Sequence, residues 1–276
     1  VSLPVDLAYP EPLHEGKAKS FGTILIKDLS WSALKLNDIV LSPSLWQNDV
    51  IFKEDIRIPL FGGNVVLKNI SYGSIFGKTQ KLRLSIDIKD IDLEKAAAAF
   101  ELPKFSGSLS GAIPKVSIAE NRLLTEGEID LALFDGQMKI TDLSADNVFS
   151  PVPSLKAGIE FDAIDLGKLT GTFDFGHISG VIRGEISELV IANGEAEHFR
   201  ASLETYKKKG VEQKISVDAL KKISILGTGT STSILDMGIY QLFKEYGYEK
   251  IGFSAYLKND KLLLVGIEDG GDRRYL

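Results

Sequence analysis

The chain has 276 residues, 44% of them apolar, a formal net charge of −6 and no cysteine. This length and apolar content allow a large core in one or two domains. The negative charge argues against nucleic acid and anionic lipid surfaces as partners, and the lack of cysteine excludes a disulfide scaffold. No apolar run reaches about 18 residues, so no membrane-spanning helix is indicated. Because the chain begins at Val1 rather than methionine, we interpret it as a fragment of a longer protein.

The first strand signal follows an irregular lead-in, residues 1–20. The segment GTILIKDLS from Gly22 is similar to GNVVLKNIS from Gly63 and to GQMKITDLS from Gly136. Each begins with glycine and ends with Asp or Asn, an aliphatic residue and Ser, which is typical of a strand between two turns. The sequence therefore predicts the same type of strand at least three times.

A repeat with a constant offset of 73 residues covers the middle of the chain. LFGGNVVLKNIS from Leu60 returns as LFDGQMKITDLS from Leu133, and the same offset holds as far as Ile118 and Ile191. Such a repeat predicts a unit that stacks on copies of itself. We assign the repeating region to residues 21–194, with units at about 60–132 and 133–205.

Within each copy, apolar residues alternate with polar ones, as expected of strands with one apolar face. About five antiparallel strands and one helical crossover would fill a unit of this length. Four glycines at equivalent positions, Gly107, Gly111, Gly180 and Gly184, indicate bulges, bends or close backbone approaches. The predicted fold is mainly β, a curved antiparallel sheet that forms a repeating open groove.

The crossover in the first copy, IDLEKAAAAFELP, is predicted to be a short helix. Asp92 can cap it, four alanines favour it, and Pro103 prevents its continuation. The counterpart, IDLGKLTGTFDFG, keeps the cap at Asp165 but contains Gly167 and Gly171. We therefore expect the second helix to be shorter, or only one turn long.

Residues 206–276 depart from the repeat and are predicted to form a C-terminal capping module. A helix is expected at residues 217–226, and GTGTSTS from Gly227 is expected to be a loop. A second helix, capped by Ser233 and ended by Gly247, is indicated by an apolar face that includes Leu235, Ile239, Leu242 and Tyr246. A hairpin with its turn at Asn259 and Asp260 should close the chain.

The histidines do not suggest a metal site. His14, His177 and His198 lack the spacing of metal ligands. His177 aligns with Lys104 in the first copy, so a solvent-facing side chain is the favoured interpretation.

Other apparent motifs also have structural explanations. GTGTSTS lacks the GK[ST] ending and the preceding strand of a phosphate-binding loop. Asp92 and Asp165 are equivalent helix caps rather than a catalytic pair of carboxylates. We therefore predict no enzymatic activity, no metal and no cofactor.

The chain resembles the C-terminal region of the YdbH-like branch of AsmA-like proteins. The resemblance rests on the order FGHISGVIRGEISELVIANGEAEHFRASLET, QKISVDALKKIS, LGTG, LFKEYGYEKIG and a final hairpin, and extends over about Leu60 to Leu264. AsmA-like proteins are stacked β-groove units, anchored in the inner membrane, that are thought to carry phospholipids across the periplasm of Gram-negative bacteria. The YdbH-like branch is associated with a small outer-membrane lipoprotein near its C-terminal end.

This resemblance implies a periplasmic, non-enzymatic groove that conducts phospholipid acyl chains between the two membranes. The alternating aliphatic set is the predicted groove lining: Leu82, Leu84, Ile86, Ile88, Ile129, Leu131, Leu133, Leu155, Ile159 and Phe161. The predicted partner edge in the terminal hairpin consists of Ile251, Phe253, Leu262 and Leu264.

Two other functions are compatible with the pattern. In one, the terminal hairpin, Ile251 to Ile267, pairs with client strands and assists the assembly of outer-membrane proteins. In the other, the chain is an ordinary β-sandwich with an adhesive or structural role, and its apolar face is covered by a second sheet.

Overall fold

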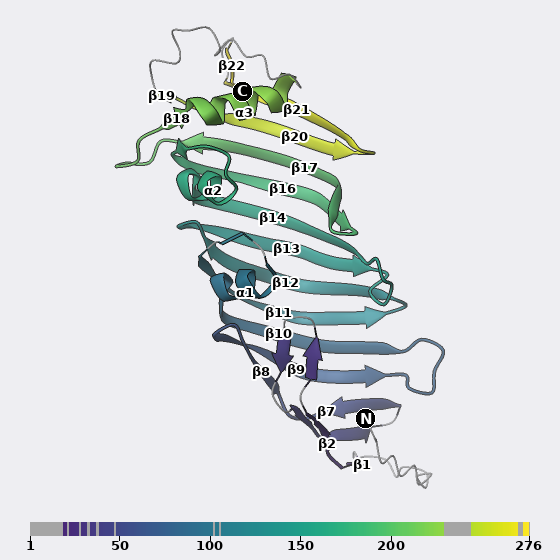
Figure 1. Ribbon diagram of the computed structural model, residues 1–276. Helices are drawn as coiled ribbons and strands as arrows, with labels where there is room; N and C mark the ends of the chain where they lie inside the picture. Colours follow the sequence, from purple (N-terminus) through teal and green to yellow (C-terminus); the bar gives the residue numbers. More distant parts are fainter. Residues whose placement is uncertain are drawn as a thin grey trace.

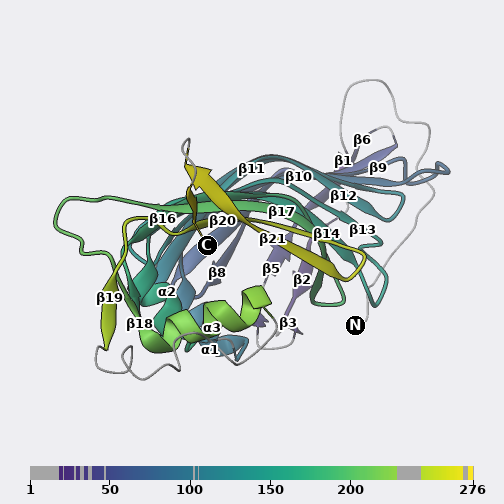
Figure 2. The same ribbon diagram turned by 90° about the horizontal axis from the view of Figure 1, so that it is seen from above.

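One large antiparallel sheet dominates the computed structural model of the chain. The structure describes residues 19–20, 22–27, 29–31, 34–36, 39–46, 48–101, 103–104, 106–228, 244–269 and 273–275. Within these residues, fifteen strands form the sheet in the order β1-β6-β7-β9-β10-β11-β12-β13-β14-β16-β17-β20-β21-β22, and β8 also pairs with β9 (Figure 1). The sheet is not closed into a barrel, and it curves over α1, α2 and α3 as seen in Figure 2. The predicted mainly β fold with an open, curved sheet is confirmed.

Short strands precede the repeat. Their bounds are β1 Lys19–Ser20, β2 Ile24–Ile26, β3 Leu29–Trp31, β4 Leu34–Leu36, β5 Ile39–Leu41, β6 Pro43–Trp46, β7 Asp49–Phe52 and β8 Ile56–Leu60. The strand signal after Gly22 corresponds to β2, which has three residues and pairs with β5 outside the large sheet. This segment therefore does not form a third long strand of the type that begins at Gly63 and Gly136.

The two copies of the repeat have the same elements. The first contains β9 Gly63–Gly73, β10 Lys81–Asp92, α1 Leu93–Ala99, β11 Gly107–Ala119 and β12 Arg122–Leu133. The second contains β13 Gly136–Asp146, β14 Ser154–Asp165, α2 Leu166–Thr172, β15 Ile178–Ser179, β16 Val181–Ala192 and β17 Glu195–Tyr206. Each copy thus contributes four long strands to the sheet rather than about five.

Bulges in the long strands recur in both copies and bend the sheet. Asn69 and Asp142 have positive φ of 52° each, and the pairing register shifts beside them. A second pair of bulges lies at Asp90 and Ala163, with φ of 53° and 57°. Because a bulge increases local twist and bends its strand, these positions account for the curvature of the groove.

The glycines mark close approaches between strands. At Gly107, a Cβ atom would lie 2.1 Å from the carbonyl oxygen of Ala132 on β12. At Gly180, it would lie 2.2 Å from the hydroxyl of Tyr248. Both distances are too short for any side chain, so these two glycines allow neighbouring segments to pack closely.

The crossover helices differ from expectation in one respect. Asp92 caps α1 and accepts hydrogen bonds from the backbone N–H groups of Glu94 and Lys95, as predicted. The prediction that α2 is shorter is wrong, because α1 and α2 are both seven residues long. In α2, the buried Thr170 hydroxyl donates to the carbonyl of Leu166 at 2.7 Å. Tertiary packing therefore outweighs the low helix propensity of its glycines and threonines.

The C-terminal module begins after β17. Its elements are β18 Lys214–Ser216, α3 Val217–Thr228, β19 Glu245–Gly247, β20 Gly252–Lys258, β21 Lys261–Asp269 and β22 Arg273–Tyr275. The predicted helix from Val217 and the final hairpin are confirmed, with positive φ at Asn259 and Asp260 in the hairpin turn.

The second predicted helix of this module falls largely on residues 229–243, which lie outside the described residues. Its proposed face included Leu235, Ile239 and Leu242, which lie there, and Tyr246. The prediction for Tyr246 is wrong, because this residue lies in β19. β19 pairs with β18, and β18 pairs with β15 in a small separate sheet, so long-range pairing determines the conformation at this position.

Candidate functional site

All ten residues of the predicted groove lining lie on one face of the large sheet. In the first copy, Ile86 is opposite Leu67 and Ile113 on the two neighbouring strands. In the second copy, the equivalent Ile159 is opposite Ile140 and Ile186. The pair Ile129 and Ile140 joins the two copies, because β12 and β13 are neighbours. The cross-strand register therefore makes the apolar face continuous across both copies.

This face is only partly covered. Of the ten residues, Ile129 is buried, Leu155 is 44% exposed, and the other eight are half-buried. A second sheet packed on this face, as in a sandwich, would bury such side chains completely. The sheet therefore presents an elongated apolar surface that is partly open to solvent.

The C-terminal module covers part of the apolar face in the second copy. Ala219 of α3 is fully buried in a cluster with Leu166 of α2 and Ile182 of β16. Leu133 and Phe161, two of the predicted lining residues, contact this cluster. Figure 2 shows α3 on the concave side of the sheet. The protein's own helix therefore already contacts this end of the predicted lining.

The residues predicted as a partner edge are divided between two environments. Leu262 and Leu264 lie on β21 and are 53% and 37% exposed. Ile251 packs against the cluster around α3, and Phe253 lies on β20, which is paired on both sides. Of the four predicted edge residues, only Leu262 and Leu264 therefore lie on β21, the second strand of the hairpin.

The opposite face of the sheet contains a hollow of about 1200 Å³ that extends from β11 to β21 and is called the polar hollow for its charged side chains. Four large apolar residues also contribute to its lining: Leu131, Met138, Phe161 and Leu203. This hollow was not among the features predicted from the sequence, although the polar residues that alternate with the predicted lining are a signal for it. Carboxylates outnumber basic groups in its wall, so the hollow is acidic. The polar and charged side chains that line it are Ser108, Ser110, Asp130, Gln137, Lys139, Glu160, Asp162, Arg183, Glu185, Ser202, Glu204 and Ser254.

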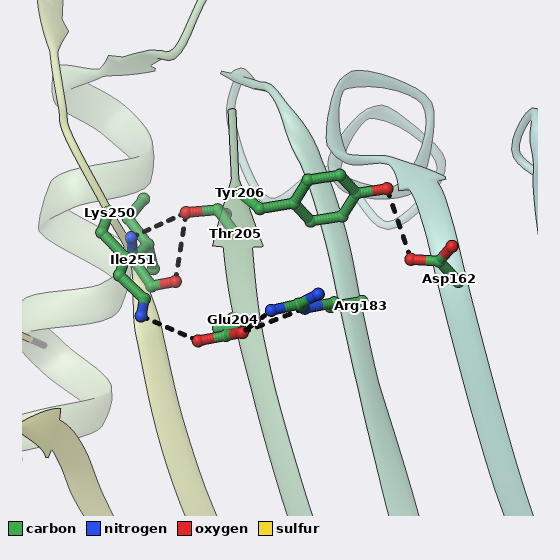
Figure 3. Close-up of polar contacts among 7 residues, drawn as sticks. All are labelled: Asp162, Arg183, Glu204, Thr205, Tyr206, Lys250 and Ile251. Atoms are coloured by element: carbon green, nitrogen blue, oxygen red, sulfur yellow. Dashed lines mark hydrogen bonds and ion pairs between the residues drawn. The ribbon is translucent and has the colours of Figure 1, made fainter. Parts of the chain in front are cut away.

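A charged network at the edge of this hollow joins the second copy to the C-terminal module. Glu204 of β17 accepts from Arg183 at 2.6 Å and forms an ion pair with Lys250 at 2.8 Å (Figure 3). Lys250, and then Arg183, hold the pKa of Glu204 below its usual range. Next to it, Tyr206 donates a hydrogen bond of 3.3 Å to Asp162 on β14. These contacts connect β17 to β16, to β14 beyond it and to the segment before β20.

A buried hydroxyl reinforces the same junction. Thr205, which is 1% exposed, accepts a hydrogen bond of 2.8 Å from the backbone N–H of Ile251 (Figure 3). The Thr205 hydroxyl also lies 3.2 Å from the Ile251 carbonyl, to which it donates. A buried polar side chain with both its donor and its acceptor satisfied is a structural connection.

The described residues contain no group of three or more metal-ligating side chains placed to hold a metal ion. His177 is exposed, as predicted. No helix within the described ranges is long and apolar enough to cross a membrane.

Comparison of the chain with protein-family models, curated proteins and solved structures found no match.

Proposed function

We propose that the chain is a non-enzymatic, lipid-binding segment whose apolar face holds acyl chains along the groove. The observation that carries the proposal is an apolar face that is continuous through Ile86, Ile129 and Ile159 and on which eight of the ten predicted lining side chains are only half-buried. A partly uncovered apolar surface that continues through both copies is typical of a binding surface. Each methylene moved from water onto such a face contributes about 0.8 kcal/mol, so one acyl chain supplies on the order of 10 kcal/mol before losses.

The resemblance to the YdbH-like branch of AsmA-like proteins supports a specific version of this proposal. In that version, the cargo is phospholipid, the location is the periplasm, and the full-length protein is anchored in the inner membrane. The groove then conducts acyl chains between the inner and outer membranes, with a small outer-membrane lipoprotein as a partner at the C-terminal end. A cargo recognised by its acyl chains needs no charged pocket, because its head groups remain in water.

The test places a charge at equivalent positions in both copies. Ile86→Asp combined with Ile159→Asp should abolish co-purified lipid, measured by mass spectrometry of organic extracts, and leave the circular dichroism spectrum nearly unchanged. The matched control is Arg83→Asp combined with Lys156→Asp, equivalent exposed positions on the opposite face. This control should retain lipid. Loss of fold in the first variant would assign Ile86 and Ile159 to a protein core instead.

A second candidate function is β-strand pairing with client outer-membrane proteins. It is favoured by β21, which over residues 261–266 pairs only with β20 among the described strands. Four consecutive side chains of this strand, Leu262 to Val265, are between 37% and 59% exposed. Such an edge can accept a further strand. Crosslinking in cells from Leu262 should capture unfolded barrel strands if this function is correct.

A further inference from the structure

Two phenylalanines at equivalent positions of the repeat extend into solvent. Phe76 is 83% exposed and Phe149 is 78% exposed, the highest values among the large apolar side chains of the described residues. They lie 73 residues apart, in the loop between β9 and β10 and in the loop between β13 and β14. An exposed phenylalanine retains an unfavourable contact with water, so its presence at the same place in both copies requires an explanation.

Both loops have the same ordered backbone. The N–H of Phe76 donates to the side-chain oxygen of Asn48 at 3.3 Å, and that of Phe149 donates to the side-chain oxygen of Asn121 at 2.8 Å. In each loop, the residue before the phenylalanine also donates to the backbone carbonyl of the same asparagine, at 3.1 Å. The two asparagines are themselves 73 residues apart. The repeat thus builds one loop conformation twice and presents the phenylalanine from it.

The loop sequences have little else in common. Residues 74–80 read SIFGKTQ and residues 147–153 read NVFSPVP, so the phenylalanine is the one identical residue. The loop backbone does not require a phenylalanine ring, because the ring is exposed and the hydrogen bonds to Asn48 and Asn121 come from backbone N–H groups. The side chain itself is therefore the shared feature.

The two loops extend the apolar face at one edge of the groove. They lie at the strand ends opposite α1 and α2, because each loop precedes β10 or β14 and each helix follows the same strand (Figure 1). Leu155, on the apolar face beside the second loop, is 44% exposed, and Val152 within that loop is 46% exposed. In the first copy, Tyr72 of the apolar face is 36% exposed beside the loop. Exposed apolar side chains therefore continue from the face toward each phenylalanine.

We propose that Phe76 and Phe149 form an aromatic edge that contacts an acyl chain bound on the apolar face. This inference rests on the proposed lipid-binding function and adds two ligand contacts outside the sheet. Each phenylalanine covers the chain from the loop side of the groove and removes methylene groups from water. The occupant is a single lipid molecule in the groove, not a bilayer surface.

Binding of dispersed dibromostearic acid tests the contribution of the two side chains. Phe76→Ser combined with Phe149→Ser should weaken binding about tenfold, because the variant lacks two rings that the bound acyl chain would partly cover. Val211→Ser removes another exposed apolar side chain, between β17 and β18, and should leave the affinity unchanged. Equal affinity of the double variant and the unsubstituted chain would overturn the proposal.

Bromine quenching tests the contact directly. Phe76→Trp and Phe149→Trp, each corrected for the fluorescence of Trp31 and Trp46, should be quenched by dispersed dibromostearic acid at the concentrations that saturate binding. Quenching only by vesicles of brominated phosphatidylcholine would assign these side chains to a bilayer surface and refute the proposal. Saturable binding without quenching would refute the aromatic edge and leave the proposed function intact. Absence of any binding to the unsubstituted chain would refute both.

Discussion

The two copies of the repeat have nearly identical backbones, but their last strands differ in register. In the first copy, Leu109 of β11 is opposite Leu131 of β12. The residues 73 positions later are Ile182 and Glu204, yet Ile182 is opposite Thr205. From His198 onward, the final strand of the second copy has therefore slipped by one residue relative to the sequence alignment, whereas Glu195 and Ala196 keep the register of the first copy.

The slip exchanges the two faces of the last strand. Leu203 packs against the cluster on the apolar face, and Glu204 lies on the other face beside Arg183. In the first copy, Leu131 packs on the apolar face and its neighbour Asp130 lies on the other. Because side chains alternate along a strand, a shift of one residue moves every side chain to the other face. The sequence of β17 contains the matching inversion of polar and apolar residues, so pattern and register changed together.

This difference in register distinguishes the copy that is followed by another copy from the copy that is followed by the C-terminal module. The first copy is followed by β13, which is the equivalent of β9, the first strand of that copy. The second is followed by β20 and the junction formed by Thr205 and Glu204, while α3 covers part of its apolar face. The sheet of one repeat copy can thus be extended or ended by a change in its last strand and in the strand that pairs with it.

Removing the cover from the second copy should have the largest effect. Ala219→Asp places a charge at a fully buried position of α3 and should lower the free energy of unfolding by about 4 kcal/mol. Urea denaturation measures the loss. Hydrogen exchange should accelerate in β16 and β17 more than in β10 and β11. The matched control is Ile225→Asp on the same helix, where the side chain is 44% exposed and the change should be small.

The buried hydroxyl at the junction should have an intermediate effect. Thr205→Val leaves the Ile251 N–H without its side-chain acceptor and should cost about 1–3 kcal/mol in thermal or urea unfolding. Ala132 is the equivalent residue of the first copy and is exposed. Ala132→Val should change stability by less than about 0.5 kcal/mol. Equal losses at the two positions would contradict a specialised junction in the second copy.

The helix caps should give the smallest and most similar effects. Asp92→Ala and Asp165→Ala should each lower the free energy of unfolding by about 1 kcal/mol. The Asp92 change should be the larger, because Asp92 accepts from two backbone N–H groups and Asp165 accepts from one. Urea unfolding of the single and double variants measures both effects and their additivity. A larger loss at Asp165 would show that the context of α2 outweighs the number of hydrogen bonds.

Several elements could be predicted because their signals are local. The alternation around Ile86 and Ile159 indicated strands with one apolar face, and the register places those residues on one face. Asp92 capped a helix that its own alanines favour. In α2, local propensity gave the wrong length, because a buried Thr170 and contacts with the terminal module stabilise the helix.

The bends of the sheet could not be predicted from composition. Glycines were expected to mark some of them, but four of the repeated bulges lie at Asn69, Asp90, Asp142 and Ala163. Among these, Asn and Asp tolerate positive φ, whereas Ala163 gives no local signal. The position of a bulge, where one strand has an extra residue relative to its neighbour, depends on the strand with which it pairs. The local sequence of a single strand does not contain that information.

The sequence alone determined the repeat, the strand type, the first crossover helix and the final hairpin, because each depends on neighbours within a few residues or on a constant offset. The tertiary structure decided the slip of β17, the polar hollow, the contact of α3 with the apolar face and the exposure of Phe76 and Phe149. These features depend on which strands become neighbours and on which segments cover each face. Pairing and burial between segments that are distant in the sequence determine these features, and the local pattern of residues does not.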